Sequence, residues 1–325
     1  MKSTWKMFLG LTIFALLLAA CAPAAAPAPT AVPTAAPTLA PTAEPTAVPA
    51  PVFTDGLGRS VQLESIPQRI ISLAPSNTEI LFAVGAGAQV IARDDLSDTP
   101  AAAQTLPSVG GFSGYNVEQM VALKPDLILA AEINTPEQVK AMEDAGLTVY
   151  YLSNPTDFEG LYANLALVGQ LSGHEGEAAA LNESLKARVQ AVTKAAAQAQ
   201  ETPSVFYELD STDPAKPWTS GPGTFVDLII RMAGGRNVGA ELDAEWAQIS
   251  QEALIVADPD YILMGDAMWG MTAEQVAARP GWDGLKAVQT QKVLPFDDNL
   301  VSRPGPRLVD GLEAMLKIFH PELVK

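Results

Sequence analysis

Cysteine and histidine are nearly absent from this chain. Its 325 residues include one cysteine and two histidines, His174 and His320. One cysteine cannot form a disulfide within the chain, and neither histidine has a partner at the spacing of a metal site. The sequence also lacks an available Cys–His pair and the Gly-x-Ser-x-Gly spacing of a nucleophile elbow. We therefore predict a protein that is not an enzyme and that holds no metal or cofactor of its own.

Basic residues are scarce as well. The chain has 20 Lys and Arg against 37 Asp and Glu, a formal net charge of -17, and no Lys/Arg-rich run. This balance argues against nucleic acid as a partner and against attachment to an anionic membrane through a basic face. Because 48% of the residues are hydrophobic, most of the chain is expected to be globular. Single cores stop growing near ~250–300 residues, so the length suits two lobes.

The longest apolar run near the N-terminus is short. Met7–Ala20 follows Lys2 and Lys6 and has 14 residues, whereas a membrane span needs ~20. This pattern is typical of a secretory signal over residues 1–20. The letters LAAC that end at Cys21 resemble the lipobox of bacterial lipoproteins, in which the cysteine is lipidated and becomes the new N-terminus. An ordinary secretion signal with an incidental cysteine is the alternative. The resemblance implies an extracytoplasmic protein, lipid-anchored at Cys21 to the cell membrane, at the cell surface or in the periplasm.

Residues 21–52 have the composition of a linker. Proline recurs at every fourth position from Pro29 to Pro49, with Ala and Thr between. Such a segment cannot bury a core and favours extended polyproline conformation. We predict a spacer between the lipid and the folded body. An O-glycosylated stalk would have the same mechanical role.

From Val52 onward, short apolar runs alternate with helical patterns, which predicts mainly parallel α/β sheets. Ile70 begins a strand, and Ser76–Glu79 has the pattern of a capping box that opens a helix ending near Gly85. Between 175 and 200 an apolar stripe recurs at helical spacing, which predicts one long helix bridging two lobes. The expected division is an N-terminal lobe (53–168), a bridging helix (169–201) and a C-terminal lobe (202–325).

The second half repeats the first. The stretch NVEQMVALKPDLIL at 116–129 aligns without a gap with SQEALIVADPDYIL at 250–263, at an offset of 134 residues, and the flanking units follow in the same order. Two similar lobes place a ligand in the cleft between them, where strand-end loops face each other. The repeat keeps a glutamate in each copy, Glu118 and Glu252. A carboxylate at the second position of a helix is favourable by itself, by ~0.3–1 kcal/mol.

Several motifs together resemble the helical-backbone class of ABC-importer substrate-binding proteins, which capture cobalamin, ferric siderophores and haem. They are RIISLAPSNTE, SDTP, VALKPDLILA, WTSGPGTFVDLI, GGRNV and ADPDYIL, and the resemblance covers nearly everything from Val52. APSNTE, SDTPAAAQ, PWTSG and EWAQIS are most similar to the cobalamin-binding subgroup. The resemblance implies two lobes joined by one helix and an expected monomer. It also implies delivery of a small ligand to an ABC permease dimer with its ATPase subunits.

The resemblance assigns ligand contacts residue by residue. Phe112, Trp218 and Trp246 match the aromatic positions of the cleft, and Arg303 matches its arginine. Leu96 and Ala131 stand where the subgroup has aromatic residues, and the loop before Arg303 is one residue longer. Tyr115 and Trp269 are expected to supply the missing aromatic area. Glu118 and Glu252 match the two glutamates that dock on arginines of the two-fold permease.

Other interpretations remain open at this stage. A ferric siderophore is often anionic, and Arg93 and Arg303 are the strong candidates for cleft cations. A haem could be ligated by Tyr115 or Tyr207. A surface-tethered enzyme would need a carboxylate pair from the following residues: Asp94, Asp95, Asp297 and Asp298. A passive interaction module on a stalk would need no deep aromatic cleft.

Overall fold

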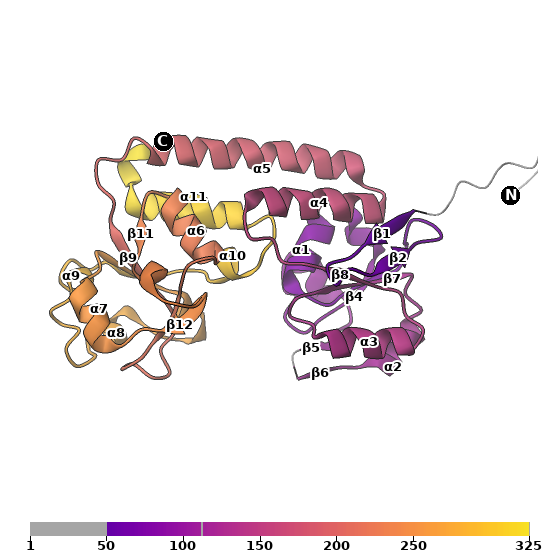
Figure 1. Ribbon diagram of the computed structural model, residues 1–325, viewed down its shortest axis with the longest axis horizontal. Coiled ribbons are helices and arrows are strands. Elements are labelled where there is room, and N and C mark those ends of the chain that lie inside the picture. The colour runs from indigo at the N-terminus through magenta and orange to yellow at the C-terminus, as the bar shows by residue number, and fades with distance from the viewer. Residues whose placement is uncertain (1–50, 112, 325) are drawn as a thin grey trace, which may run out of the picture. The chain divides into compact units, whose positions relative to one another are not determined.

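The computed structural model describes residues 51–111 and 113–324, and these form two similar α/β lobes (Figure 1). The predicted signal over 1–20, Cys21, most of the predicted linker and Phe112 lie outside the described residues.

The N-terminal lobe is built on a parallel sheet of four strands in the order β4-β3-β7-β8. These are β3 (Ile70–Ser72), β4 (Val90–Arg93), β7 (Leu127–Ala131) and β8 (Val149–Leu152). Two short antiparallel hairpins flank it, β1 (Val52–Thr54) with β2 (Ser60–Gln62) and β5 (Gly110–Gly111) with β6 (Gly114–Tyr115). Its helices are α1 (Pro75–Ala83), α2 (Val117–Leu123) and α3 (Pro136–Asp144).

The C-terminal lobe has a mixed sheet in which β9, β11, β13 and β14 are parallel. Strand β10 is antiparallel to β9, and β12, at the edge, is antiparallel to β10. The strands are β9 (Ser204–Asp210), β10 (Trp218–Ser220), β11 (Arg236–Asn237), β12 (Trp246–Gln248), β13 (Tyr261–Met264) and β14 (Val293–Pro295). The helices are α6 (Phe225–Met232), α7 (Gln251–Ala257), α8 (Ala273–Ala277), α9 (Lys286–Gln289), α10 (Asn299–Ser302) and α11 (Leu308–Phe319).

Two consecutive helices connect the lobes. Helix α4 (Phe158–Ser172) packs against α1, and α5 (Glu175–Ala196) packs against α4 toward its N-terminal end and against α11 and α6 toward its C-terminal end. Figure 1 shows α5 running above both lobes. The expected long helix is therefore present with 22 residues. The predicted lobe boundary at 168 falls inside α4, and the division into 53–168, 169–201 and 202–325 stays a prediction.

Each sheet separates two cores because successive side chains of a strand point to opposite faces. In β7, Leu127 and Leu129 join a core that continues through α4, α5 and α11 into the C-terminal lobe, where it includes Val205 and Leu263. Ile128 faces the opposite way, into a separate core of the N-terminal lobe. One hydrophobic core therefore crosses from lobe to lobe.

The predicted capping box at Ser76–Glu79 is wrong. Helix α1 begins at Pro75, its N-cap is Ala74, and no side chain caps it. Proline is favourable at the first helical position because its missing N–H would have no helical partner there. The four residues from Ser76 to Glu79 are buried, and Glu79 forms ion pairs with the other lobe. The predicted end near Gly85 is confirmed, since Gly85 follows α1 with φ of 95°.

The repeat is present in three dimensions. Asn116 caps α2 through the N–H of Gln119, and Ser250 caps α7 through the N–H of Ala253. Both helices have seven residues, and each ends at a left-handed residue, Lys124 or Asp258. The Pro-Asp turn that follows has a structural role in both lobes. Asp126 accepts hydrogen bonds from the N–H groups of Gln68 and Arg69, and Asp260 accepts one from Ser204.

Candidate ligand cleft and docking helices

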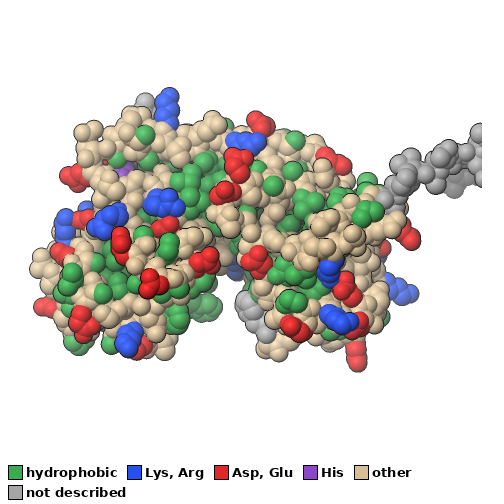
Figure 2. Space-filling model, in the orientation of Figure 1, with side chains coloured by type: hydrophobic (Ala, Val, Ile, Leu, Met, Phe, Trp, Pro, Cys, Tyr) green, Lys and Arg blue, Asp and Glu red, His purple; other side chains and the backbone are tan. Residues whose placement is uncertain are grey.

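A cavity of about 240 Å³ lies between the two lobes, and Figure 2 shows the surface hollowed there. Glu132 and Asn154 line it from the N-terminal lobe, just after β7 and β8 end. Trp246, Phe225 and Ser302 line it from the C-terminal lobe. The carboxyl ends of parallel strands are the usual place for a ligand in α/β sheets. The cavity is smaller than typical pockets of ~300–1,000 Å³, so a large ligand would need the open cleft around it.

Two of the expected aromatic residues share one face of a β-ribbon. Strand β10 pairs with β12 so that Trp218 lies opposite Gln248 and Ser220 opposite Trp246. Residues two apart on a strand point to the same face, so Trp218 and Trp246 are diagonal neighbours on that face. They are 41% and 44% exposed, which leaves ring surface available. Trp246 borders the cleft directly.

The other expected aromatic positions differ from one another. Trp269 is 78% exposed, outside this cavity, and lines a separate hollow with Asp210 and Asp266. Tyr115 is partly buried, and its hydroxyl donates to the carbonyl of Leu73 (3.2 Å) and accepts from Asn134 (2.7 Å). Burial and the nearby Asp94 raise the pKa of Tyr115 to about 12. Its hydroxyl is thus already used within the protein.

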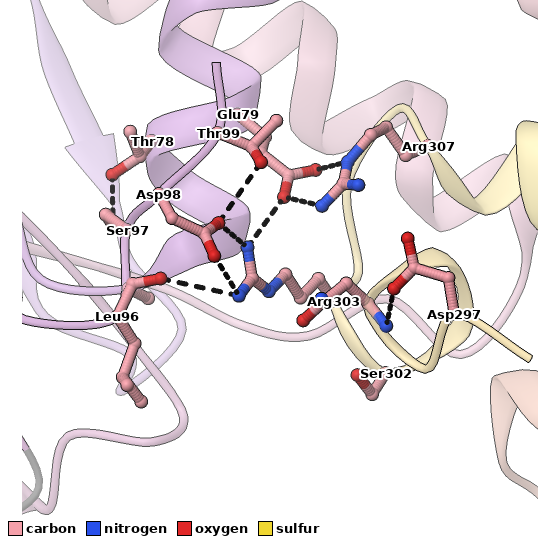
Figure 3. A network of polar contacts seen from close by, with 12 residues as sticks. Thr78, Glu79, Leu96, Ser97, Asp98, Thr99, Asp297, Ser302, Arg303 and Arg307 are labelled. Carbon is pink, nitrogen blue, oxygen red and sulfur yellow. Dashed lines mark hydrogen bonds and ion pairs between the residues drawn. The ribbon is translucent and has the colours of Figure 1, made fainter. Parts of the chain in front are cut away.

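Arg303 lies where the lobes meet, at the end of α10 (Figure 3). Its guanidinium contacts Asp98 at 2.6 Å and Glu79 at 3.4 Å, both from the N-terminal lobe, and donates to the carbonyl of Leu96 at 3.4 Å. The side chain is 12% exposed. Burial raises the pKa of Asp98, but the hydrogen bond and charge of Arg303 outweigh burial and hold that pKa below its usual range.

Arg307 completes this network, which we call the interlobe ion-pair network (Glu79, Asp98, Arg303, Arg307). It donates to both carboxylate oxygens of Glu79, at 2.9 and 2.6 Å. These hydrogen bonds raise the pKa of Arg307. No sequence pattern indicated that Glu79, Asp98 and Arg307 interact. The sequence does show two arginines, Arg303 and Arg307, on either side of Pro-Gly-Pro. It does not indicate which residues of the other lobe they contact.

Arg93 is also engaged. Its guanidinium donates to the carbonyl of Ala103 at 3.0 Å and to those of Asp94 and Asp95 at 2.7 and 3.2 Å. Arg93 and Arg303, the two arginines that could have neutralised an anionic ligand, are thus both bound to protein oxygens. Burial raises the pKa of the neighbouring Asp94.

Glu118 and Glu252 lie at matching places, each at the second position of its helix and exposed to solvent. A hydrogen bond from its own backbone N–H lowers the pKa of Glu252. This effect is in keeping with a carboxylate at the second position of a helix. Among the described residues, neither Glu118 nor Glu252 forms an ion pair with another part of the protein.

Two further observations concern the described part of the chain. No three His, Cys, Asp or Glu side chains among residues 51–111 and 113–324 gather closely enough to hold a metal ion. None of the helices there combines the length and apolar composition that crossing a membrane requires.

Comparison with known proteins identifies the family. Residues 70–300 match the family model described as periplasmic binding protein. The chain belongs to the periplasmic binding protein family. Within this family, it is 32% identical over 276 residues to an uncharacterized ABC transporter substrate-binding lipoprotein of Bacillus subtilis (strain 168), covering 83% of this chain and 86% of that one. It is 30% identical to a cobalamin-binding protein of Halobacterium salinarum (strain ATCC 29341 / DSM 671 / R1), over 82% of this chain and 73% of the relative.

A solved structure extends the likeness. The apo form of a periplasmic haem-binding protein from Roseiflexus sp. RS-1 superposes with a TM-score of 0.71 at 26% identity, covering 79% of this chain and 99% of that one. This periplasmic binding protein is thus an ABC-type substrate-binding protein of the vitamin B12, haem and siderophore group. Its relatives bind substrates without transforming them, which confirms that it is not an enzyme. The fold expected from the sequence, two α/β lobes around a cleft, is likewise confirmed.

Proposed function

We propose that this protein captures cobalamin or a related corrinoid in the interlobe cleft and delivers it to a two-fold ABC permease. The observation that supports this ligand most is the cleft's surface. Trp218 and Trp246 share a half-exposed face of the β10–β12 ribbon, and aromatic faces bury a flat ring with little loss of side-chain entropy. We propose Tyr115, Trp269 and Phe112 as further aromatic ligand contacts, although Phe112 lies outside the described residues.

The charges of the cleft favour a ligand that is not strongly anionic. Arg93 and Arg303 already bind carbonyls and carboxylates of the protein. Carboxylates also face the opening, with Glu132 and Glu245 lining the cavity. A carboxylate-rich siderophore or the propionates of haem would have to compete with Asp98 and Glu79 for Arg303. A corrinoid carries neutral amides, which need no free cation and can accept a hydrogen bond from a guanidinium that keeps its carboxylate partners.

Ligation of haem by a tyrosine is disfavoured for a second reason. A phenolate ligand requires loss of the hydroxyl proton, but burial raises the pKa of Tyr115 to about 12. The hydroxyl of Tyr207 is buried and donates to Asp298 at 2.6 Å, and burial raises its pKa strongly. Haem and ferric siderophores are therefore the alternative ligands for this cleft.

Docking is proposed for Glu118 and Glu252. Both carboxylates are exposed and occupy equivalent places of the two lobes. A two-fold partner offers the same cation twice, so one carboxylate per lobe suits it. We further propose secretion through residues 1–20 and lipid anchoring at Cys21, with the protein acting as an extracytoplasmic monomer.

Calorimetric titration of the full chain in detergent tests the ligand. We expect one-to-one binding of cyanocobalamin and weaker binding of haem and of a ferric hydroxamate. Trp246→Ala should weaken cobalamin binding about 10–100-fold, because a central aromatic contact contributes a large share of the binding energy. Glu118→Gln, outside the cleft, should leave the affinity unchanged. Tight binding of haem or the hydroxamate without cobalamin binding would refute the corrinoid proposal.

A further inference from the structure

The exposed sides of α2 and α7 are apolar at the same two positions. Val121 and Ile255 are equivalent in the repeat, and each is 42% exposed. The next residue is exposed in both helices as well, Ala122 in α2 and Val256 in α7, the latter at 86%. We call Val121–Ala122 and Ile255–Val256 the paired apolar patches.

These patches contribute little to either core. The inward side of each helix is occupied by another equivalent pair, Met120 and Leu254, both fully buried. A surface helix normally places polar residues on its solvent side. A single exposed apolar residue needs no explanation, but the same exposed pair in both halves calls for one.

Each patch adjoins the glutamate proposed for docking. Glu118 precedes Val121 by three residues, and Glu252 precedes Ile255 by three, a spacing that places side chains on one helix face. The charge at the end of the two helices is not repeated, since Lys124 ends α2 and the equivalent residue Asp258 ends α7. The repeated surface is thus one carboxylate followed by two apolar residues.

We infer that the paired apolar patches pack against the permease, one patch on each half of its two-fold surface, beside the cation that meets Glu118 or Glu252. This inference rests on the proposed docking function. The partner surface it requires has an apolar residue next to an arginine or lysine in both halves. The glutamates orient the approach through long-range attraction, whereas the apolar contacts slow dissociation.

Site-specific photo-cross-linking tests the inference independently of the transported ligand. A photo-reactive residue replaces Val121 or Ile255 in the full chain, produced in its own cells, and cross-linked partners are identified by mass spectrometry. We expect a cross-link to the ABC permease from both positions. Ile66 and Val324, which are exposed apolar residues of the two lobes outside these helices, serve as matched control positions and should give none.

Variants separate the inference from the docking function. A photo-reactive residue at position 118 or at position 252, with the other glutamate kept, should also cross-link to the permease. Val121→Ser with Ile255→Ser should weaken this complex about tenfold. Ile66→Ser with Val324→Ser should have no effect. Glu118→Lys with Glu252→Lys should abolish cross-linking from 121 and 255. Denaturant unfolding of each variant excludes a folding defect.

Each outcome has one meaning. Cross-links from positions 118 and 252 but not from 121 and 255, or a serine pair equal to its control, would overturn the apolar contact and leave docking intact. Cross-linking from one lobe only would overturn the two-fold arrangement. No permease cross-link from any of the four positions would overturn docking itself.

Discussion

Glu79 is a buried carboxylate whose partners belong to the other lobe. It is 4% exposed and forms ion pairs with Arg303 and Arg307. Removing one partner of a buried ion pair leaves uncompensated charge, a cost of ~3–5 kcal/mol in fully buried cases. Because both arginines keep some solvent contact, we expect Glu79→Gln to lower the free energy of unfolding by about 2–3 kcal/mol. Urea unfolding followed by far-UV circular dichroism measures this.

The matched control is Glu118→Gln, which changes the same group at an exposed position. It should shift the free energy of unfolding by less than about 0.5 kcal/mol. Equal stability of Glu79→Gln and the unmodified chain would mean that the interlobe ion-pair network contributes no net stability.

The contacts of Glu79 could not be predicted from the sequence. The pattern from Ser76 to Glu79 fits a capping box locally, so the local explanation was sufficient. Glu79 and Arg303 are more than 200 positions apart, and no periodicity relates them. Their pairing depends on how two lobes meet, which is a property of the assembled fold. Trp218 and Trp246 were predicted as aromatic ligand contacts, but the sequence did not indicate that they lie on strands β10 and β12, nor the register that gives them a shared face.

At the scale of the element, the two Pro-Asp turns each hold the start of a neighbouring strand. Asp260 accepts from the N–H of Ser204 at 2.7 Å and from its hydroxyl at 2.8 Å, and it pairs with Lys286. Burial raises the pKa of Asp260, but the hydrogen bonds from Lys286 and Ser204 outweigh it and lower that pKa to about 2. The ionised form is thus favoured by folding. Its stabilisation is complete above the unfolded-state pKa near 3.8 and is lost as the pH falls toward 2.

We therefore expect Asp260→Asn to lower the free energy of unfolding at pH 7 by about 1–2 kcal/mol. The difference from the unmodified chain should shrink between pH 4 and pH 2, because the native carboxylate is protonated there. Thermal unfolding across this pH range tests it. Asp283→Asn, an exposed carboxylate of the same lobe, should behave like the unmodified chain. A difference that stayed constant with pH would assign the effect to the changed side chain rather than its charge.

Elements were the most predictable level of this protein. The gapless repeat placed Glu118 and Glu252 at the second position of a helix, and α2 and α7 begin accordingly, because helix ends depend on local hydrogen bonds. The long helix was predictable from its apolar stripe. The pairing of β10 with β12 was not predictable, since both strands are short, have few apolar residues and depend on neighbours from elsewhere in the chain.

For the whole molecule, the decisive feature is the core that continues between the lobes. It includes residues of both sheets, of the connecting helices α4 and α5, and of α11 in the C-terminal lobe. Arg188 on α5 adds hydrogen bonds to Asp310 at 2.5 Å and to Glu313 at 2.8 Å on α11. A packed core of this kind resists continuous deformation. Hinge closure around a ligand, in contrast, needs a few unpacked residues that absorb the motion.

We therefore expect the distance between the lobes to change by less than about 2 Å when cyanocobalamin binds. Spin labels at Lys140→Cys and Lys216→Cys, exposed positions of the two lobes, report it by pulsed electron resonance. Cys21→Ser removes the only native thiol of the chain. Arg303→Ala should leave the distance peak narrow, because the shared core and not the polar network fixes the lobes. Val189→Gly, at a position of α5 that packs into this core, should broaden the peak by loosening the helix. Ligand-induced shortening well beyond 2 Å would show instead that the lobes close on the ligand and that the shared core yields during binding.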